Sequence, residues 1–421
     1  MVATLSVSEQ VSGNNSDIEG LVDVERLFSE QLSPLRLHPG AALAVYRHGR
    51  LVLDLTAGFA DTQQGQPVRT DTLFLLFSST KPLASVSLWQ QIERGAAGLD
   101  DPVAEYWPAF AGNGKAGVTL RHVLSHRGGF PLTPPTLTPE RWGDWTWAVR
   151  TIEDMPLSHE PGAVSAYHHL TQQWVCAELV HRLDGRAYGD YLRAEITGPL
   201  EMVDTVVGLP EDKVQRAALL HATESTDERE REILQRFNRL EVRRAVVPAA
   251  TGFSTARDMA RFYAALAAGG ALDGARILRP ETVERMLRVE VDGDVDRTFD
   301  VPVRRGLGFE LGGLADPRRH WPGATSTVRT FWHGGFGSSV CWGDADAGLA
   351  MAFLSNGVRR DEAGAIARRD LSDAVRVAFR SCEGVSQALP GCSRAGTWAI
   401  TQDAARSFSH EPPGPAKDRA S

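Results

Sequence analysis

Ser78 and Lys81 stand three residues apart where a helix is expected to begin. Residues three apart on a helical turn share a face, so the Lys81 amine can accept the Ser78 proton once burial lowers the lysine pKa. The helix N-terminus also places backbone N–H groups beside an oxygen that becomes negatively charged during acyl transfer. Of the four lysines in the sequence, only Lys81 has a serine three positions before it. The pair therefore indicates a nucleophilic serine with a lysine base.

The same spacing also fits a solvated lysine beside a helix cap, and two other segments compete as sites. Residues 252–256 approximate a Gly-x-Ser-x-Gly elbow but lack the closing glycine, so Ser254 is more typical of a helix N-cap. His122 and His126 are four residues apart, but no glutamate lies between them. This spacing favours structural histidines over a metal pair. No metal and no cofactor are expected.

Four short segments occur in a particular order along the chain. The four together are more specific as a motif than any one of them. They are Leu76–Pro82 around the Ser-x-x-Lys pair, Val123–Phe130, the triplet Tyr167–His169 and the triplet His333–Gly335. With these segments the chain resembles the serine β-lactamase and penicillin-binding-protein superfamily over roughly residues 20–382, and in particular the family VIII carboxylesterases and class C β-lactamases. The resemblance implies a serine hydrolase that acts through an acyl-enzyme.

The resemblance also implies a role for each residue of the site. Ser78 would attack an ester carbonyl, and Lys81 and Tyr167 would share the general acid and base work. The backbone N–H groups of Ser78 and Phe336 would form the oxyanion hole. Tyr167 needs a cationic neighbour to act as a base near neutral pH, because the ordinary pKa of tyrosine is about 10. Lys81 could supply that charge.

Two positions depart from the family pattern in the segments expected to bind substrate, which include Gly334 and Gly335. His169 stands where the family has the asparagine of Tyr-x-Asn, and His333 stands where it has the lysine of Lys-Thr-Gly. A neutral histidine binds a lactam carboxylate less firmly than a lysine does. The departures therefore favour an esterase or acyltransferase over a lactamase, and a carboxylesterase is the expected function. Three alternatives stay open, namely an acyltransferase of the same fold, a β-lactamase or D-amino-acid peptidase, and a relative that binds a ligand without catalysis.

The periodicity of apolar residues predicts an α/β (α+β) fold, with an antiparallel sheet flanked by helices and a helical insertion region. Helices are expected over 18–32, from Ser78 to about Gly95, over 256–268 and over 362–381. Strands are expected over 41–47, 50–58, 308–311, 328–332, 338–342 and 349–355. The expected organisation is a flexible tail over 1–17, a sheet domain from 18–100 and 248–383, a helical insertion over 101–247 and a second flexible tail over 384–421.

Composition narrows the class of partner. The net charge is −8 and the sequence has no dense block of Lys and Arg, which argues against nucleic acid or an anionic membrane. A small-molecule ester is the expected partner, and the oligomeric state stays open. Residues 1–17 have neither a basic n-region nor an apolar h-region, so no export signal is expected. The cysteines Cys176, Cys341, Cys382 and Cys392 have no Cys-x-x-Cys spacing. Free thiols and a cytoplasmic location are expected.

Three tryptophans, Trp142, Trp145 and Trp147, lie close together in the predicted insertion. Aromatic faces bury large apolar groups well, so these rings could line an acyl or alcohol pocket beside the active site. They could equally pack the insertion. The sequence does not decide between the two.

Overall fold

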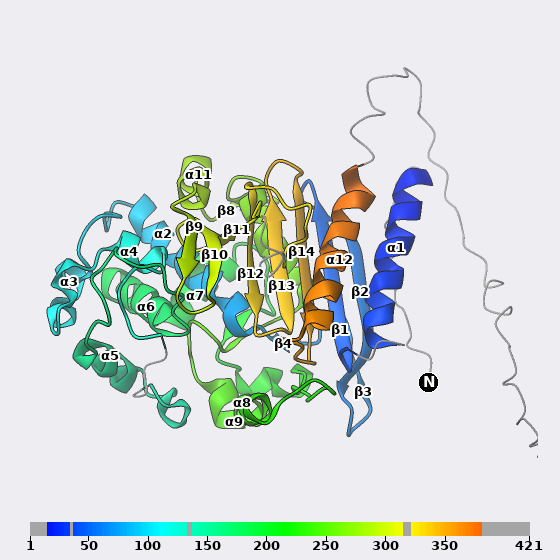
Figure 1. Cartoon of the computed structure of the whole chain (residues 1–421), viewed down its shortest axis with the longest axis horizontal. Coiled ribbons are helices and arrows are strands. Elements are labelled where there is room, and N and C mark those ends of the chain that lie inside the picture. Colours follow the sequence, from blue (N-terminus) through cyan, green and yellow to red (C-terminus); the bar gives the residue numbers. More distant parts are fainter. Residues whose placement is uncertain (1–14, 34–36, 133–136, 315–320, 381–421) are drawn as a thin grey trace, which may run out of the picture. The chain divides into compact units, whose positions relative to one another are not determined.

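The central feature of the fold is a nine-stranded antiparallel sheet. In the computed structural model, which describes residues 15–33, 37–132, 137–314 and 321–380, the strand order is β3-β2-β1-β14-β13-β12-β11-β10-β9. The first strand of this sheet along the chain therefore pairs with the last, and β1 lies beside β14 (Figure 1). The strands are β1 (Gly40–Arg47), β2 (Arg50–Asp61), β3 (Gln66–Pro67), β9 (Val291–Asp296), β10 (Val301–Arg305), β11 (Glu310–Leu311), β12 (Thr330–Gly335), β13 (Ser339–Asp344) and β14 (Leu349–Ser355).

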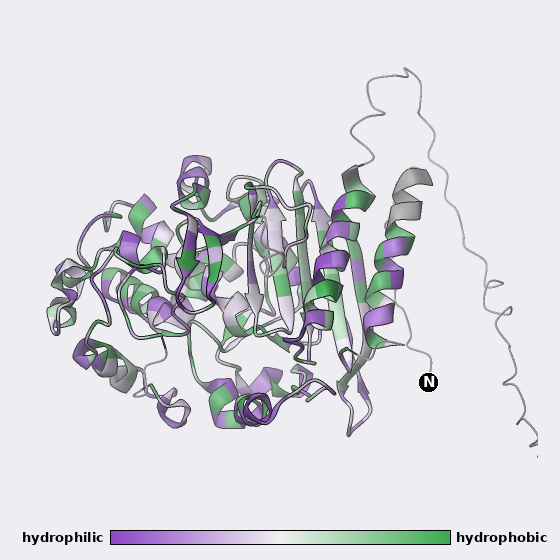
Figure 2. Ribbon diagram, in the orientation of Figure 1, coloured by the Kyte–Doolittle hydropathy of each residue, from purple (hydrophilic) through white to green (hydrophobic). Residues whose placement is uncertain are grey.

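Helices cover both faces of this sheet because its central strands are apolar on both sides. Side chains alternate along a strand, so Leu43 and Val45 of β1 enter one apolar cluster while Ala42 and Ala44 enter another. The first cluster is closed by α1 (Asn15–Leu32) and α12 (Glu362–Arg380), which pack side by side on the sheet. The second is closed by α10 (Ala256–Ala267). Figure 2 shows that α1 and α12 carry apolar and polar residues in alternating patches, as expected for helices with one buried face.

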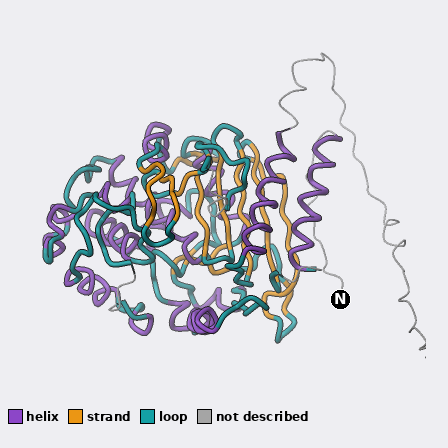
Figure 3. The backbone as a smooth tube through the Cα atoms, viewed as in Figure 1, coloured by secondary structure: helices purple, strands orange, loops and turns teal. Residues whose placement is uncertain are grey.

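A helical part lies beside the sheet (Figure 3). It is built around α2 (Lys81–Glu93), which is buried over most of its length. Helices from the loop-rich part of the sequence surround α2. The remaining helices are α3 (Val103–Tyr106), α4 (Leu120–Leu124), α5 (Trp145–Asp154), α6 (Thr171–Asp184), α7 (Tyr188–Leu192), α8 (Glu228–Asn238), α9 (Leu240–Arg244) and α11 (Pro280–Leu287). Small sheets form from β4 (Phe74–Leu75), β6 (Gly252–Ser254) and β5 (Val206–Val207), and from β7 (Ala271–Leu272) and β8 (Ala275–Arg276).

The predicted fold class is confirmed, and the element boundaries show where the sequence was less informative. Helix α1 begins at Asn15, three residues before the expected start at residue 18. The hairpin of β9 and β10 was not predicted, because four of the six residues of β9 are Asp or Gly, which are depleted in strands. Both expected tails lie largely outside the described residues. Among the described residues, every helix is too short or too polar to span a lipid bilayer.

Candidate active site

Ser78 lies on a strained turn in front of α2. Residues Phe77–Thr80 form a single 3₁₀ turn, and Phe77 has a φ of +46°, in the left-handed region that non-glycine residues rarely adopt. Thr80, the N-cap of α2, makes no side-chain cap bond. Its Oγ1 instead accepts a hydrogen bond from the Gly252 N–H at 3.0 Å. This bond fixes the turn against β6.

Lys81 reaches back from the first residue of α2 to Ser78. Its Nζ lies 2.9 Å from Ser78 Oγ and donates to the carbonyl oxygens of His169 at 2.7 Å and Ala249 at 3.2 Å. The side chain is 1 % exposed. Burial removes water from the ammonium group and lowers the pKa of Lys81 to about 7. An amine with this pKa can act as a base near neutral pH.

We expect this lysine to make stability depend on pH. Its pKa falls from an ordinary 10.5 to about 7 on folding. Between these values the unfolded chain holds a proton that the folded chain lacks, so the Lys81 contribution to the free energy of unfolding rises with pH. Denaturant titrations of wild type and Lys81→Met near neutral and near pH 10 check this. The stability of wild type relative to the variant should be greater at the higher pH, and a difference that does not change with pH would contradict it.

Tyr167 is buried beside the serine and lysine, among aromatic rings. Its ring centroid lies 5.1 Å from Lys81 Nζ, 4.7 Å from the His126 ring and 4.8 Å from the Phe299 ring. His126 Nδ1 accepts a hydrogen bond from the His168 backbone N–H, which fixes the loop that carries Tyr167. Burial lowers the pKa of His126 well below its ordinary value and that of His168 to about 3. Both rings are therefore neutral near pH 7 and add no charge beside the phenol.

A buried ion cluster supports the same loop. Arg305 of β10 lies 6.0 Å from the Tyr167 ring centroid and is fully buried. It donates to Asp296 at 2.6 Å, to Glu310 at 3.0 Å and to Ser165 Oγ at 2.8 Å. Two carboxylates thus offset the charge of this guanidinium, which makes it a structural support. Removing one partner of such a cluster is strongly destabilising, because an uncompensated charge stays buried.

The turn that joins β12 and β13 forms the wall opposite Tyr167. A Cβ at Gly335 would collide with the Leu76 carbonyl oxygen, so only glycine lets β12 approach the serine turn this closely. Phe336 follows with a φ of +43°, and its ring packs 5.3 Å from the Phe77 ring. Arg368 of α12 donates to the Gly337 carbonyl oxygen at 2.9 Å and so supports this turn. The two residues with positive φ, Phe77 next to Ser78 and Phe336, therefore pack against each other.

These elements enclose one pocket of about 710 Å³. The structure brings six of the eight predicted site residues to its lining, whereas Lys81 and Gly335 lie behind it. His169 Nδ1 bonds to the Leu132 carbonyl oxygen at 3.1 Å, and burial lowers its pKa. His333 Nδ1 lies 2.9 Å from the Gly334 carbonyl oxygen. The predicted residues in the lining are Ser78, Tyr167, His169, His333, Gly334 and Phe336.

Other candidates from the sequence have structural places. Ser254 is buried and bonds to Thr205 Oγ1 at 2.7 Å, while the N-cap of α10 is Thr255, one residue later than expected. His122 completes a capping box with Thr119 at the start of α4. Within the described ranges, no three His, Cys, Asp or Glu side chains are grouped as metal ligands would be. The free thiols of Cys176 and Cys341 are buried, and the other two cysteines lie outside the described residues.

Sequence reasoning missed Phe299 and the cluster around Arg305. Both belong to the β9 and β10 hairpin, which carried no recognisable strand pattern. Phe299 lines the pocket, and Thr298 Oγ1 donates to the Tyr167 carbonyl oxygen at 2.9 Å. The backbone acceptors of Lys81 were also missed, because a carbonyl oxygen has no signature in a sequence.

Known proteins are similar to this chain along most of its length. The family model described as Beta-lactamase matches residues 28–375. A curated relative, "Esterase/beta-lactamase LipL" from Mycobacterium tuberculosis (strain ATCC 25618 / H37Rv), is 30% identical over 367 residues, covering 79% of this chain and 80% of the relative.

Solved structures give the same result. A penicillin-binding-protein homologue from Caulobacter crescentus superposes with a TM-score of 0.76 at 28% identity, covering 89% of this chain and 100% of that chain. A family VIII carboxylesterase superposes with a TM-score of 0.75 at 26% identity, covering 87% of this chain and 99% of that chain. The chain therefore belongs to the β-lactamase family, the serine hydrolase family to which these esterases also belong.

Proposed function

We propose that this protein is a serine carboxylesterase that cleaves small esters through an acyl-enzyme on Ser78. The observation that carries the proposal is the 2.9 Å contact between Lys81 Nζ and Ser78 Oγ, together with a lysine pKa of about 7. A lysine of ordinary pKa would be protonated at neutral pH and could not take the serine proton. The buried Lys81 is partly neutral there and can.

In acylation, Ser78 Oγ bonds to the ester carbonyl carbon while its proton passes to Lys81 Nζ. The backbone N–H groups of Ser78 and Phe336 donate to the oxyanion, and the strained turns hold them in place before substrate arrives. The bond to the alcohol oxygen then breaks, and the alcohol leaves with a proton returned by Lys81 or Tyr167.

In deacylation, water attacks the acyl carbon and its proton passes to the pair of Lys81 and Tyr167. The proton then returns to Ser78 Oγ as the carboxylic acid leaves. The same two residues thus serve both halves of the reaction.

The walls of the pocket support an apolar ester as substrate. Phe299, Val301, Trp321 and Ile366 give one part of its lining an apolar surface. The lining also includes the charged residues Glu310, Arg360, Asp361, Glu362, Arg368 and Arg369. His333 stands where the family has the lysine that would hold a carboxylate. We expect the four apolar side chains to contribute to the binding of an uncharged ester.

Mass spectrometry of the intact protein tests the proposal. Mixing with p-nitrophenyl esters of graded chain length should release a burst of nitrophenol and add the mass of the acyl group to the protein. Proteolysis should place the added mass on the peptide that contains Ser78. An adduct on another peptide, or ester turnover with no adduct at any chain length and quench time, would contradict the mechanism.

A β-lactamase is the second candidate, because the LipL relative is described as both esterase and β-lactamase. Adding a chromogenic cephalosporin to the same panel separates the two activities. We expect kcat/KM for the best ester to exceed that for the cephalosporin by at least about tenfold, since His333 gives the lactam carboxylate no fixed positive charge. The reverse order would make the β-lactamase the better description.

A further inference from the structure

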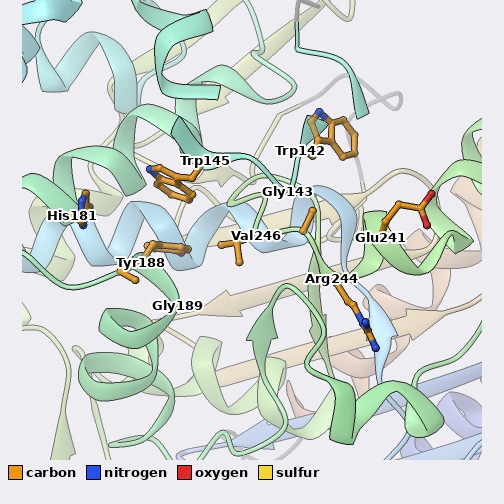
Figure 4. Close-up of a pocket in the computed structure, with 11 residues that line it drawn as sticks. Trp142, Gly143, Trp145, His181, Tyr188, Gly189, Glu241, Arg244 and Val246 are labelled. Atoms are coloured by element: carbon orange, nitrogen blue, oxygen red, sulfur yellow. The ribbon is translucent and has the colours of Figure 1, made fainter. Parts of the chain in front are cut away.

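A second cavity of about 400 Å³ lies in the helical part (Figure 4). Its lining includes Trp142, Trp145, Tyr188 and Val246, and shares no residue with the lining of the pocket at Ser78. Trp147, the third tryptophan of this segment, lies outside it with the Arg141 guanidinium 4.7 Å from its ring centroid. The sequence did not decide whether Trp142 and Trp145 line a pocket or only pack the insertion. In the structure both line a cavity that is separate from the catalytic pocket.

The polar atoms of these two tryptophans are already used by the protein. Trp142 Nε1 donates to the Leu137 carbonyl oxygen at 3.2 Å, and Trp145 Nε1 donates to Glu178 Oε2 at 2.7 Å. Neither indole therefore has an N–H left to donate to a ligand. The aromatic ring surfaces are what the cavity offers, and such surfaces stack with flat apolar groups.

The charged groups of the lining lie at the ends of the cavity. Figure 4 places Glu241 and Arg244 at one end and His181 at the other. Glu241 is exposed, Arg244 forms an ion pair with Glu211, and His181 Nδ1 bonds to the Arg186 carbonyl oxygen. The middle of the cavity has no fixed charge to compensate an ionic ligand, so a charged ligand would lose hydration without gaining a partner.

We propose that this cavity is a second binding site, for a small, uncharged and flat aromatic molecule. Its volume falls within the range of small-molecule sites, and its walls combine large aromatic faces with few polar groups. The proposal does not depend on serine chemistry.

The site adjoins the catalytic machinery without opening into it. Phe237 stands between the two, with its ring 5.5 Å from the Trp142 ring and 4.8 Å from the Phe77 ring. Val246 lies three residues before Ala249, whose carbonyl oxygen accepts from Lys81. Because Ser78 itself faces another pocket, the binding measurement can be made on Ser78→Ala protein, which isolates it from turnover.

Binding of 2-naphthol, measured by isothermal titration calorimetry on full-length wild type and Ser78→Ala, tests the proposal. We expect saturable binding of equal affinity to both proteins. Val246→Phe should fill the cavity, and Ala187→Phe should obstruct it from an exposed position where a larger side chain meets no core. Each variant should bind at least about tenfold more weakly, and Trp147→Ala, the matched control, should bind like wild type.

Two results would overturn the proposal. One is undiminished binding by both Ala187→Phe and Val246→Phe, or by Ala187→Phe alone if the Val246→Phe protein does not fold. The other is the absence of saturable binding by wild type. The charge requirement is tested with 2-naphthalenesulfonate and 2-naphthylmethylammonium, each expected to bind at least about tenfold more weakly than 2-naphthol. Equal affinity for either ion would refute the assignment of an uncharged ligand.

Discussion

Ser78→Ala is expected to lower kcat/KM for a p-nitrophenyl ester by about 10⁴-fold or more, because it removes the atom that forms the acyl bond. The residual rate would come from the oxyanion hole and from substrate binding alone. The hydroxyl makes one hydrogen bond that the structure assigns to it, with Lys81, so the fold should be retained. Steady-state kinetics and the circular dichroism spectrum of the variant check both parts.

The adjacent serine provides a matched control. Ser79 Oγ is buried and lies 2.9 Å from Ser339 Oγ, facing the sheet and not the pocket. Ser79→Ala should therefore cost about 1 kcal/mol of stability and keep a rapid burst of nitrophenol. A Ser78→Ala protein that keeps more than about one tenth of the wild-type activity would place the nucleophile elsewhere.

The sequence predicted the parts of the site that depend on short-range geometry. One helical turn is enough to bring Ser78 and Lys81 into contact. The three-residue spacing of the serine and the lysine in the sequence indicates that turn. The central strands were also predictable, because Leu51, Leu53 and Leu55 alternate with other residues along β2. The pairing of β1 with β14 joins segments far apart in the chain, and the order of elements along the sequence indicated only that both halves build one sheet.

The remaining features arise from contacts that no local pattern encodes. The pKa of Lys81 depends on burial by segments that lie 88 and 168 residues further along the chain. Arg305 contacts Asp296 and Glu310 only because β9, β10 and β11 pair in the sheet. The acidic sequence of β9 has no strand pattern from which that pairing could be predicted. The sequence showed that the three tryptophans lie close together in one segment. The packing of α5 against α6 directs Trp145 into the second cavity and leaves Trp147 outside it.

Lys81→Met is expected to lower the acylation rate by about 10³-fold, because it removes the group that accepts the Ser78 proton. The pH profile identifies that role. Only the neutral amine can take the proton, so kcat/KM of wild type should rise with pH through about 7 and level off above it. In Lys81→Met the rise at this pH should disappear. Stopped-flow measurement of the nitrophenol burst across pH 5.5 to 9 gives both results.

Lys81→Arg distinguishes two roles of Lys81, as the base that accepts the Ser78 proton and as a positive charge near Tyr167. Arginine keeps the positive charge near Tyr167 but stays protonated throughout this pH range, so it cannot accept the serine proton. If Lys81 is the base, the arginine variant should acylate about as slowly as the methionine variant. If it instead restores most of the wild-type burst, the positive charge is what matters, and Tyr167 must take the serine proton as a phenolate. The two outcomes assign the proton in the first step to different atoms.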